Sequence, residues 1–125
     1  MTYRFSYPLA ALAVVLVSAC ASTPPASDFP AGVRTPTKAE VANAVKGKSF
    51  NFATGNIRTD YGAASNDVTA YFSGRSEKGT WRAEDGRICF EFKTIASTCN
   101  EVRLLGSDIY LKRDNGQVTQ LVPRT

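Results

Sequence analysis

The 125-residue sequence predicts a mainly β domain of the α+β type, in which one short helix precedes a set of antiparallel strands. After Gly47, apolar residues alternate with polar ones in short runs, the period expected of strands with one buried face. Asp-Gly, Asn-Gly and Ser-Gly pairs separate these runs and favour tight hairpin turns. We therefore expect a six- to seven-stranded antiparallel meander, forming a curled sheet, partial barrel or sandwich, with the helix closing one side.

The first twenty residues have the features of an export signal. Arg4 supplies a positive charge ahead of the apolar run Leu9–Val17. That run is much shorter than the roughly 20 apolar residues that cross the hydrocarbon core of a bilayer. A charged start, a short apolar stretch and small residues at its end are typical of a secretory signal peptide.

Residues 17–20, Val-Ser-Ala-Cys, resemble the lipobox of bacterial lipoprotein precursors. In that family a diacylglycerol is attached to the cysteine, and the chain is cut just before it, here between Ala19 and Cys20. In many bacteria the new amino terminus is acylated as well, for example with palmitate. Two or three acyl chains give a stable membrane anchor where one does not. The alternative is an ordinary signal peptide with a coincidental cysteine.

Ala21 bears on the membrane in which such a lipoprotein would reside. In Gram-negative lipoproteins, an Asp at this position typically retains the protein at the inner membrane. The resemblance therefore implies a protein of the cell envelope, lipid-anchored at the outer membrane and facing the periplasm.

The sequence divides into three expected parts. Residues 1–19 are the signal peptide that is removed. Residues 20–36 begin with the lipidated cysteine and hold four of the six prolines, so we expect an extended tether. Residues 37–125 are expected to fold as one small β-rich domain containing a disulfide.

A helix is predicted over residues 37–46. Thr37 and Glu40 form a capping-box pattern, in which each side chain accepts a hydrogen bond from the backbone of the other. Val41 and Val45 lie four residues apart and share one face. A helix this short is not stable alone, so we expect it to pack against the strands.

Seven runs with a period of two follow and predict the strands. Their apolar positions lie at Phe50–Phe52, Val68–Phe72, Trp81, Ile88–Phe92, Val102–Leu104, Ile109–Leu111 and Val118–Val122. The turn signals between them include Ser73-Gly74, Asp85-Gly86, Gly106-Ser107-Asp108 and Asp114-Asn115-Gly116.

Cys89 and Cys99 form an even pair in a chain that we expect to be exported, and a disulfide is the usual state of such a pair. In a hairpin whose paired residue numbers sum to 188, Cys89 faces Cys99 and Arg87 faces Glu101. A redox-active pair is the alternative, but the CxxC motif is missing. Two cysteines without histidine cannot complete a common zinc site.

Candidate site residues are few. The sequence has no histidine, which removes Ser-His and Cys-His catalysis and the commonest transition-metal ligand. Glu84 and Asp85 could act as paired carboxylates, but a hairpin turn already explains the Asp-Gly pair. Trp81, Tyr71 and Tyr110 could line a binding surface for sugar or peptide, although aromatic residues in alternating strands also serve as core. We expect no catalytic residue, metal or cofactor.

The charge pattern argues against a nucleic-acid partner. The formal net charge is +4, and acidic residues lie among most of the basic ones. A protein that grips phosphates usually concentrates its positive charge in one patch. The expected partners are the membrane, through the lipid, and a protein of the envelope.

Three motifs taken together resemble a family of small exported proteobacterial proteins of unknown function. They are Gly79-Thr80-Trp81, then Asp85-Gly86-Arg87-Ile88-Cys89, and Cys99. The resemblance would cover about residues 37–122. It implies a β-rich domain with a disulfide and carries no catalytic residue over to this chain.

The expected function is therefore that of a lipid-anchored, non-enzymatic envelope protein that binds or supports another envelope protein or component. One alternative is an inhibitor of lysozyme or protease, because such inhibitors resemble this chain in size and architecture. Another is a small enzyme, which would need a deep pocket with a perturbed carboxylate or lysine.

Overall fold

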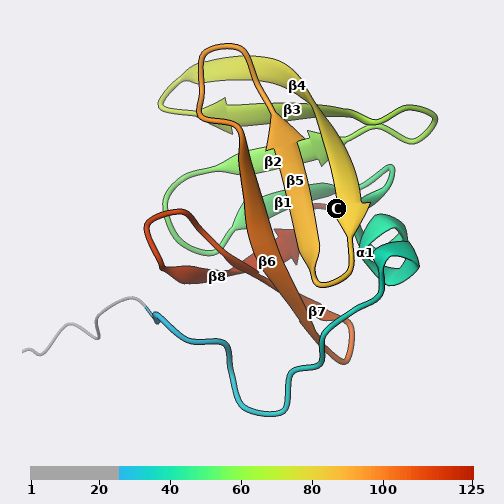
Figure 1. The fold of residues 1–125 in the computed structure, drawn as a ribbon. Coiled ribbons are helices and arrows are strands. Elements are labelled where there is room, and N and C mark those ends of the chain that lie inside the picture. The colour runs from blue at the N-terminus through green and yellow to red at the C-terminus, as the bar shows by residue number, and fades with distance from the viewer. Residues whose placement is uncertain (1–25) are drawn as a thin grey trace, which may run out of the picture.

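The computed structural model describes residues 26–125. The predictions for the signal peptide, for Ala19 and for Cys20 lie outside the described residues. Within residues 26–125, one helix and eight strands make up the fold (Figure 1). The elements are α1 (Lys38–Val45), β1 (Ser49–Phe52), β2 (Arg58–Tyr61), β3 (Asp67–Phe72), β4 (Arg75–Glu84), β5 (Arg87–Glu91), β6 (Thr98–Leu105), β7 (Asp108–Lys112) and β8 (Val118–Pro123).

The strands form a closed antiparallel barrel in which each strand pairs with the next along the chain. β8 returns to β1, with Pro123 opposite Phe50 and Leu121 opposite Phe52. The mainly β class, the meander order and the leading helix are confirmed. The strand number and the closure differ from the prediction, because there are eight strands rather than six or seven and no open edge remains between β1 and β8.

The additional strand is β2. Its inward residues, Thr59 and Tyr61, are both buried, while Arg58 and Asp60 face outward and form an ion pair of 2.6 Å. The sequence Arg-Thr-Asp-Tyr contains no aliphatic residue, so its period of two is hidden from a hydrophobicity pattern.

The helix α1 closes one end of the barrel. Its capping box is present as predicted, with Thr37 as N-cap and Glu40 three residues later. Val41 and Val45 are buried in the core, and the helix packs chiefly on β4 and β5. No helix within residues 26–125 has the length and apolar character that crossing a bilayer requires.

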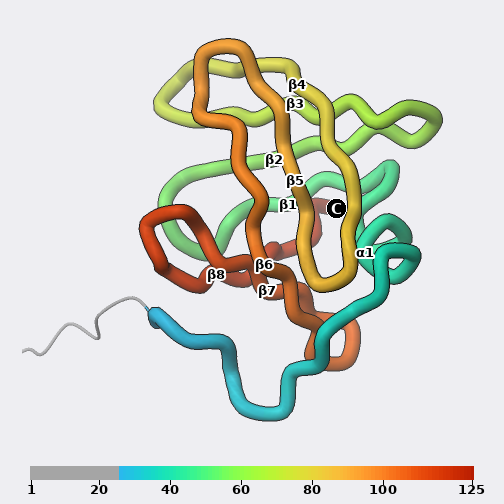
Figure 2. The backbone as a smooth tube through the Cα atoms, viewed as in Figure 1, coloured from blue at the N-terminus to red at the C-terminus, as the bar shows by residue number. Residues whose placement is uncertain are grey.

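The segment 26–36 lies against the outside of the barrel before α1 begins (Figure 2). Arg34 exchanges two backbone hydrogen bonds with Leu104 of β6. At the other end of the segment, the carbonyl of Ala26 accepts a hydrogen bond of 2.8 Å from the amide of Val118, the first residue of β8. This part of the Pro-rich stretch is thus hydrogen-bonded to the domain at both ends.

The disulfide joins neighbouring strands. Cys89 of β5 lies directly opposite Cys99 of β6, and the two sulfur atoms are bonded. Arg87 lies opposite Glu101 in the same register. The predicted pairing of the two cysteines is therefore confirmed.

Candidate functional site

A pocket of about 290 Å³ opens at the end of the barrel away from α1. β1, β3, β5 and β7 end on this side of the barrel and the following strands begin there (Figure 1). The lining residues therefore place the pocket at the barrel mouth. It lies among three of the connecting loops, residues 53–57, 92–97 and 113–117. We call it the mouth pocket. Barrel mouths are common places for small-molecule sites because the strands hold the loops rigidly around a hollow.

The walls of the mouth pocket are apolar and largely aromatic. Phe52, Ile57 and Leu111 line it together with Phe90 and Phe92. The rings of the last two are stacked, with centroids 6.0 Å apart and planes inclined by 19°. Ala70 of β3 is a small inward side chain at the lining, where a larger residue would take up part of the hollow.

A buried amide fixes one side of the rim. Asn100 of β6 is 7% exposed and donates two hydrogen bonds of 3.0 Å, to the carbonyl of Lys112 and to Oδ1 of Asp114. Its own Oδ1 accepts from the hydroxyl of Thr98 at 2.9 Å. The loop between β7 and β8 is thus tied to β6, which makes this side of the mouth pocket preorganised.

Thr59 lines the mouth pocket, but its hydroxyl oxygen has essentially no surface accessible from the hollow. The residue is only 4% exposed and lines the pocket, yet its Oγ1 has no hydrogen-bond partner within residues 26–125. Leaving a buried hydroxyl without a partner costs about 1–3 kcal/mol, and a water or ligand atom in the pocket does not reach this oxygen.

Two further buried polar atoms lie deeper in the barrel. Tyr61 OH and Trp81 Nε1 also lack partners within the described residues, and the two rings meet edge to face at 5.6 Å. Burial raises the pKa of Tyr61 well above its usual range, and the nearby Thr59 hydroxyl counters this in part. The two hydroxyls are neighbours on β2, but they do not meet in a hydrogen bond of ordinary geometry.

The rim carries one charge of each sign. Arg113 and Asp114 both line the mouth pocket, and neither forms an ion pair with the other or with another described residue. The guanidinium of Arg113 lies over Gly55, where a Cβ would come within 2.9 Å of Nη1. Gly55 has a φ of +93°, so this loop both turns sharply and leaves room for the arginine.

The aromatic residues suggested by the sequence do not share one surface. Trp81 is buried in the core. Tyr71 lies on the outside of β3, with the guanidinium of Arg58 4.2 Å above its ring. Tyr110 is on the outside of β7, four strands away from β3 in either direction around the closed barrel.

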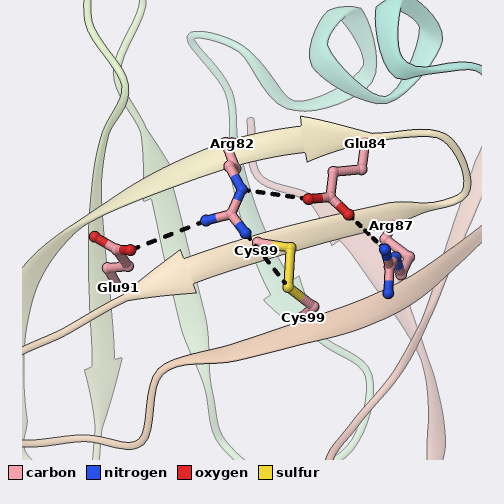
Figure 3. A network of polar contacts seen from close by, with 6 residues as sticks. All are labelled: Arg82, Glu84, Arg87, Cys89, Glu91 and Cys99. Atoms are coloured by element: carbon pink, nitrogen blue, oxygen red, sulfur yellow. Dashed lines mark hydrogen bonds and ion pairs between the residues drawn. A yellow bond between two sulfur atoms is a disulfide. The ribbon is translucent and has the colours of Figure 1, made fainter.

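The disulfide lies beneath a network of charged side chains on the outside of β4 and β5 (Figure 3). Arg82 contacts Glu84 at 3.3 Å, Glu91 at 3.9 Å and the sulfur of Cys99 at 3.9 Å. Glu84 also pairs with Arg87 at 2.7 Å. An oxygen of Glu84 and the two sulfurs lie within 4.8 Å of one another. Metal binding needs thiolates, however, and both sulfurs are held in the disulfide.

The polar residues of the mouth pocket were not singled out from the sequence. Asn100 could have been, because it has the same parity as the inward Val102 and Leu104, and a polar residue at an inward position indicates a buried polar contact. Asp114 was predicted only as the first residue of a turn, and Arg113 only as the residue before it. No sequence signal marked Thr59, since its strand was not recognised.

Comparisons with known proteins find no matching protein-family model, no matching curated protein and no matching solved structure. The geometry of the described residues must therefore support a functional proposal without help from relatives.

Proposed function

We propose that this protein is a non-enzymatic binding module of the cell envelope, anchored by a lipid on Cys20, with the mouth pocket as its binding site. The observation that carries the proposal is the mouth pocket itself, with apolar walls and a rim fixed by Asn100. A mostly apolar hollow with a few convergent polar groups is the usual form of a small-molecule site.

No carboxyl group among the described residues has a resolved pKa shift toward neutral pH. General acids and bases work best when their pKa lies near the operating pH. The shifts resolved for carboxyl groups go the other way: a hydrogen bond from Arg58 lowers the pKa of Asp60, and one from the Thr94 side chain lowers that of Glu77. Neither carboxyl lines the mouth pocket.

The lipid anchor would hold the mouth pocket near the membrane. Ala26 is hydrogen-bonded to Val118, which directly follows the rim loop 113–117. Ala26 lies six positions after Cys20, and an extended chain of that length spans at most roughly 20 Å. A ligand arriving from the bilayer surface or the nearby periplasm would meet the open end of the barrel first.

The anchoring part is tested by intact mass and membrane fractionation of the wild type and of Cys20→Ala. We expect the wild type to begin at residue 20, to carry acyl mass and to sediment with outer membranes. The alanine variant should carry no acyl mass and leave the membrane fraction. A wild type that begins at Met1, or has an unmodified thiol at position 20, would contradict the proposal.

The matched control is the double variant Cys89→Ser/Cys99→Ser, which keeps Cys20. It should still be acylated and sediment with membranes. Loss of acylation in this control would mean that folding, rather than residue 20 itself, governs the modification.

A further inference from the structure

We propose that the mouth end of the barrel docks onto the anionic phospholipid surface of the membrane in which the protein is anchored. This inference rests on the proposed function, because the lipid on Cys20 is what brings the barrel to the bilayer. Two independent observations carry it. Cations without ion-pair partners within residues 26–125 gather beside the mouth pocket, and the chain that leads to Cys20 leaves the domain at the same end.

Cations that are far apart in the sequence meet at the mouth end. Arg75, Lys78 and Lys93 are all exposed and line one surface hollow beside the start of β4. Phe92 borders Lys78 and Lys93 and also lines the mouth pocket, whose rim holds Arg113. None of these four cations forms an ion pair with a described residue. We call the four residues the basic face, and the fold thus concentrates charges that are scattered along the sequence.

The carboxylates at this end do not cancel the basic face. Glu77 lies in the same hollow, and its oxygens accept three hydrogen bonds from the loop 92–97. Asp114 on the rim has one oxygen in a hydrogen bond. Glu91 is paired with Arg82. Four cations therefore outnumber the two carboxylates that lack a cationic partner among the described residues, and the face keeps a net positive charge.

Aromatic side chains lie among these charges. Phe72 lines the hollow, and the guanidinium carbon of Arg75 lies 5.7 Å from the centre of its ring. The ring of Phe92 lies across Gly79, where an added Cβ would come within 2.5 Å of it. Both rings remain partly exposed. A surface that meets a bilayer typically combines cations for the lipid phosphates with apolar rings at the level of the headgroups.

The path of the chain brings this end of the barrel to the membrane. Ala26 is hydrogen-bonded to Val118, directly after the rim loop 113–117, and the described chain begins beside β8 (Figure 2). Ala26 lies six positions after Cys20, a span of at most roughly 20 Å. A tether this short lets the mouth end reach the headgroups and places the closed end, with α1, on the far side of the barrel.

Charge then decides which way the anchored barrel faces. A Lys or Arg close to an anionic lipid surface strengthens the attraction about fivefold. The attraction fades within a Debye length, about 8 Å at physiological salt, so the basic face gains from it only when the mouth end points at the bilayer. In that orientation the mouth pocket opens toward the headgroups.

The test is fluorescence quenching in vesicles that carry the full lipidated chain. A fluorophore is attached to one introduced cysteine, either Ala96→Cys in the loop 92–97 or Ser107→Cys in the turn between β6 and β7, and both positions are exposed. The quencher is a nitroxide on the headgroup of phosphatidylcholine. With phosphatidylglycerol in the vesicles, we expect strong quenching at position 96 and little at position 107. Without it, or at high salt, the difference should largely disappear.

Two matched double variants assign the contact to the basic face. Lys78→Gln/Lys93→Gln removes two of its cations and should lower the ratio of docked to undocked molecules about 25-fold, and each single variant about fivefold. Fluorescence lifetimes give that ratio, because docked and undocked labels differ in quenching. The control Lys46→Gln/Lys48→Gln removes the same net charge just after α1, at the closed end, and should leave the ratio unchanged.

Failure of this inference differs from failure of the proposed function. Equal quenching at positions 96 and 107 in acylated protein would overturn docking through the mouth end while the anchor stands, and would leave the basic face to an acidic protein partner. Quenching at position 96 that persists in Lys78→Gln/Lys93→Gln and without phosphatidylglycerol would also overturn the role of the basic face. An intact mass without acyl groups would overturn the anchored function itself, and this inference with it.

Discussion

Asp85 joins the helix to the turn between β4 and β5. Its Oδ1 accepts a hydrogen bond of 2.7 Å from the amide of Lys38, the first residue of α1. The capping box of Thr37 satisfies a different amide, so two separate side chains serve the amino end of one short helix. A carboxylate there also interacts favourably with the positive end of the helix dipole. Asp85 therefore binds the amino end of the helix in addition to forming the Asp-Gly turn that the sequence predicts.

Removing that contact should loosen the closed end of the barrel. We expect Asp85→Ala to lower the free energy of unfolding by about 1 kcal/mol, as the loss of a helix cap usually does. Urea denaturation measures the change. The control Asp108→Ala, an exposed carboxylate at the start of β7, should stay within about 0.5 kcal/mol of the wild type. Equal effects of the two variants would show that Asp85 acts only as a turn residue.

Single residues were predictable where one local rule decides their place. Thr37 and Glu40 met the capping-box pattern, and the structure has it. Trp81 was harder, because alternation says that a residue faces one side without saying which side is the inside. Asp85 was beyond prediction, since its partner Lys38 lies 47 residues away and only the tertiary fold brings them together.

The hairpin of β5 and β6 shows how a covalent constraint makes an element predictable. The disulfide specified one register, and the structure confirms it at Cys89 and Cys99 and at Arg87 and Glu101. Arg87 nevertheless forms its ion pair with Glu84 of β4 rather than with Glu101, which lies opposite it on β6. A register fixes backbone neighbours, whereas long charged side chains choose among several partners within reach.

The disulfide should matter more to stability than to shape. It closes a loop with a sequence separation of 10, for which the loss of unfolded-chain entropy is roughly 2–3 kcal/mol. We expect Cys89→Ser/Cys99→Ser to lower the free energy of unfolding, measured by urea denaturation, by about that amount while keeping the barrel's circular dichroism spectrum. A loss of folded signal without denaturant would show instead that the barrel cannot form unless the bond is present.

Glu77 of β4 holds the loop between β5 and β6. Its carboxylate accepts hydrogen bonds from the amides of Lys93 and Thr94, at 2.9 and 2.7 Å, and from the Thr94 hydroxyl at 2.6 Å. These bonds, with the hydroxyl contributing most, lower the pKa of Glu77 below its ordinary value of 4.5. The loop is one side of the mouth pocket, so its order bears on the proposed site.

The lowered pKa gives this clamp a definite pH dependence. Because the folded value lies below the unfolded one, the contribution of Glu77 is complete above pH 4.5 and is lost as the pH falls through the folded value. We expect the hydrogen-exchange protection factors of residues 93 and 94 to fall over that acid range. In Glu77→Gln the same amides should be less protected at neutral pH and show little further change. Equal pH profiles in both proteins would assign the effect to other carboxyls.

At the scale of the whole molecule, closure is the feature that the sequence could not provide. Each hairpin turn is a local signal, but the pairing of β1 with β8 joins residues about 70 positions apart. Whether a meander closes depends on strand number, tilt and stagger together, and the unrecognised β2 left the expected number too small. The mouth pocket was equally hidden, because it exists only where loops from three separate hairpins meet around a closed ring.

A last prediction concerns the seam of the barrel, which is the pairing of β1 with β8 that closes it. Leu121 and Val122 are adjacent on β8, but Leu121 is 1% exposed and faces the core whereas Val122 is 40% exposed and faces out. Leu121→Ala should lower the free energy of unfolding by about 2–5 kcal/mol through the cavity it leaves, and Val122→Ala should change it by no more than about 0.5 kcal/mol.

Hydrogen exchange in Leu121→Ala then shows whether closure is cooperative. If β1 and β8 belong to the same unit as the rest, the amides of β1 and of β4 should lose protection by the same free energy. If only β1 and β8 lose protection while β4 keeps its own, the barrel opens at this seam as a separate step. That result would contradict unfolding of the barrel as a single cooperative unit. The mouth pocket would then exist only while β1 and β8 are paired, because Phe52 at the end of β1 is part of its wall.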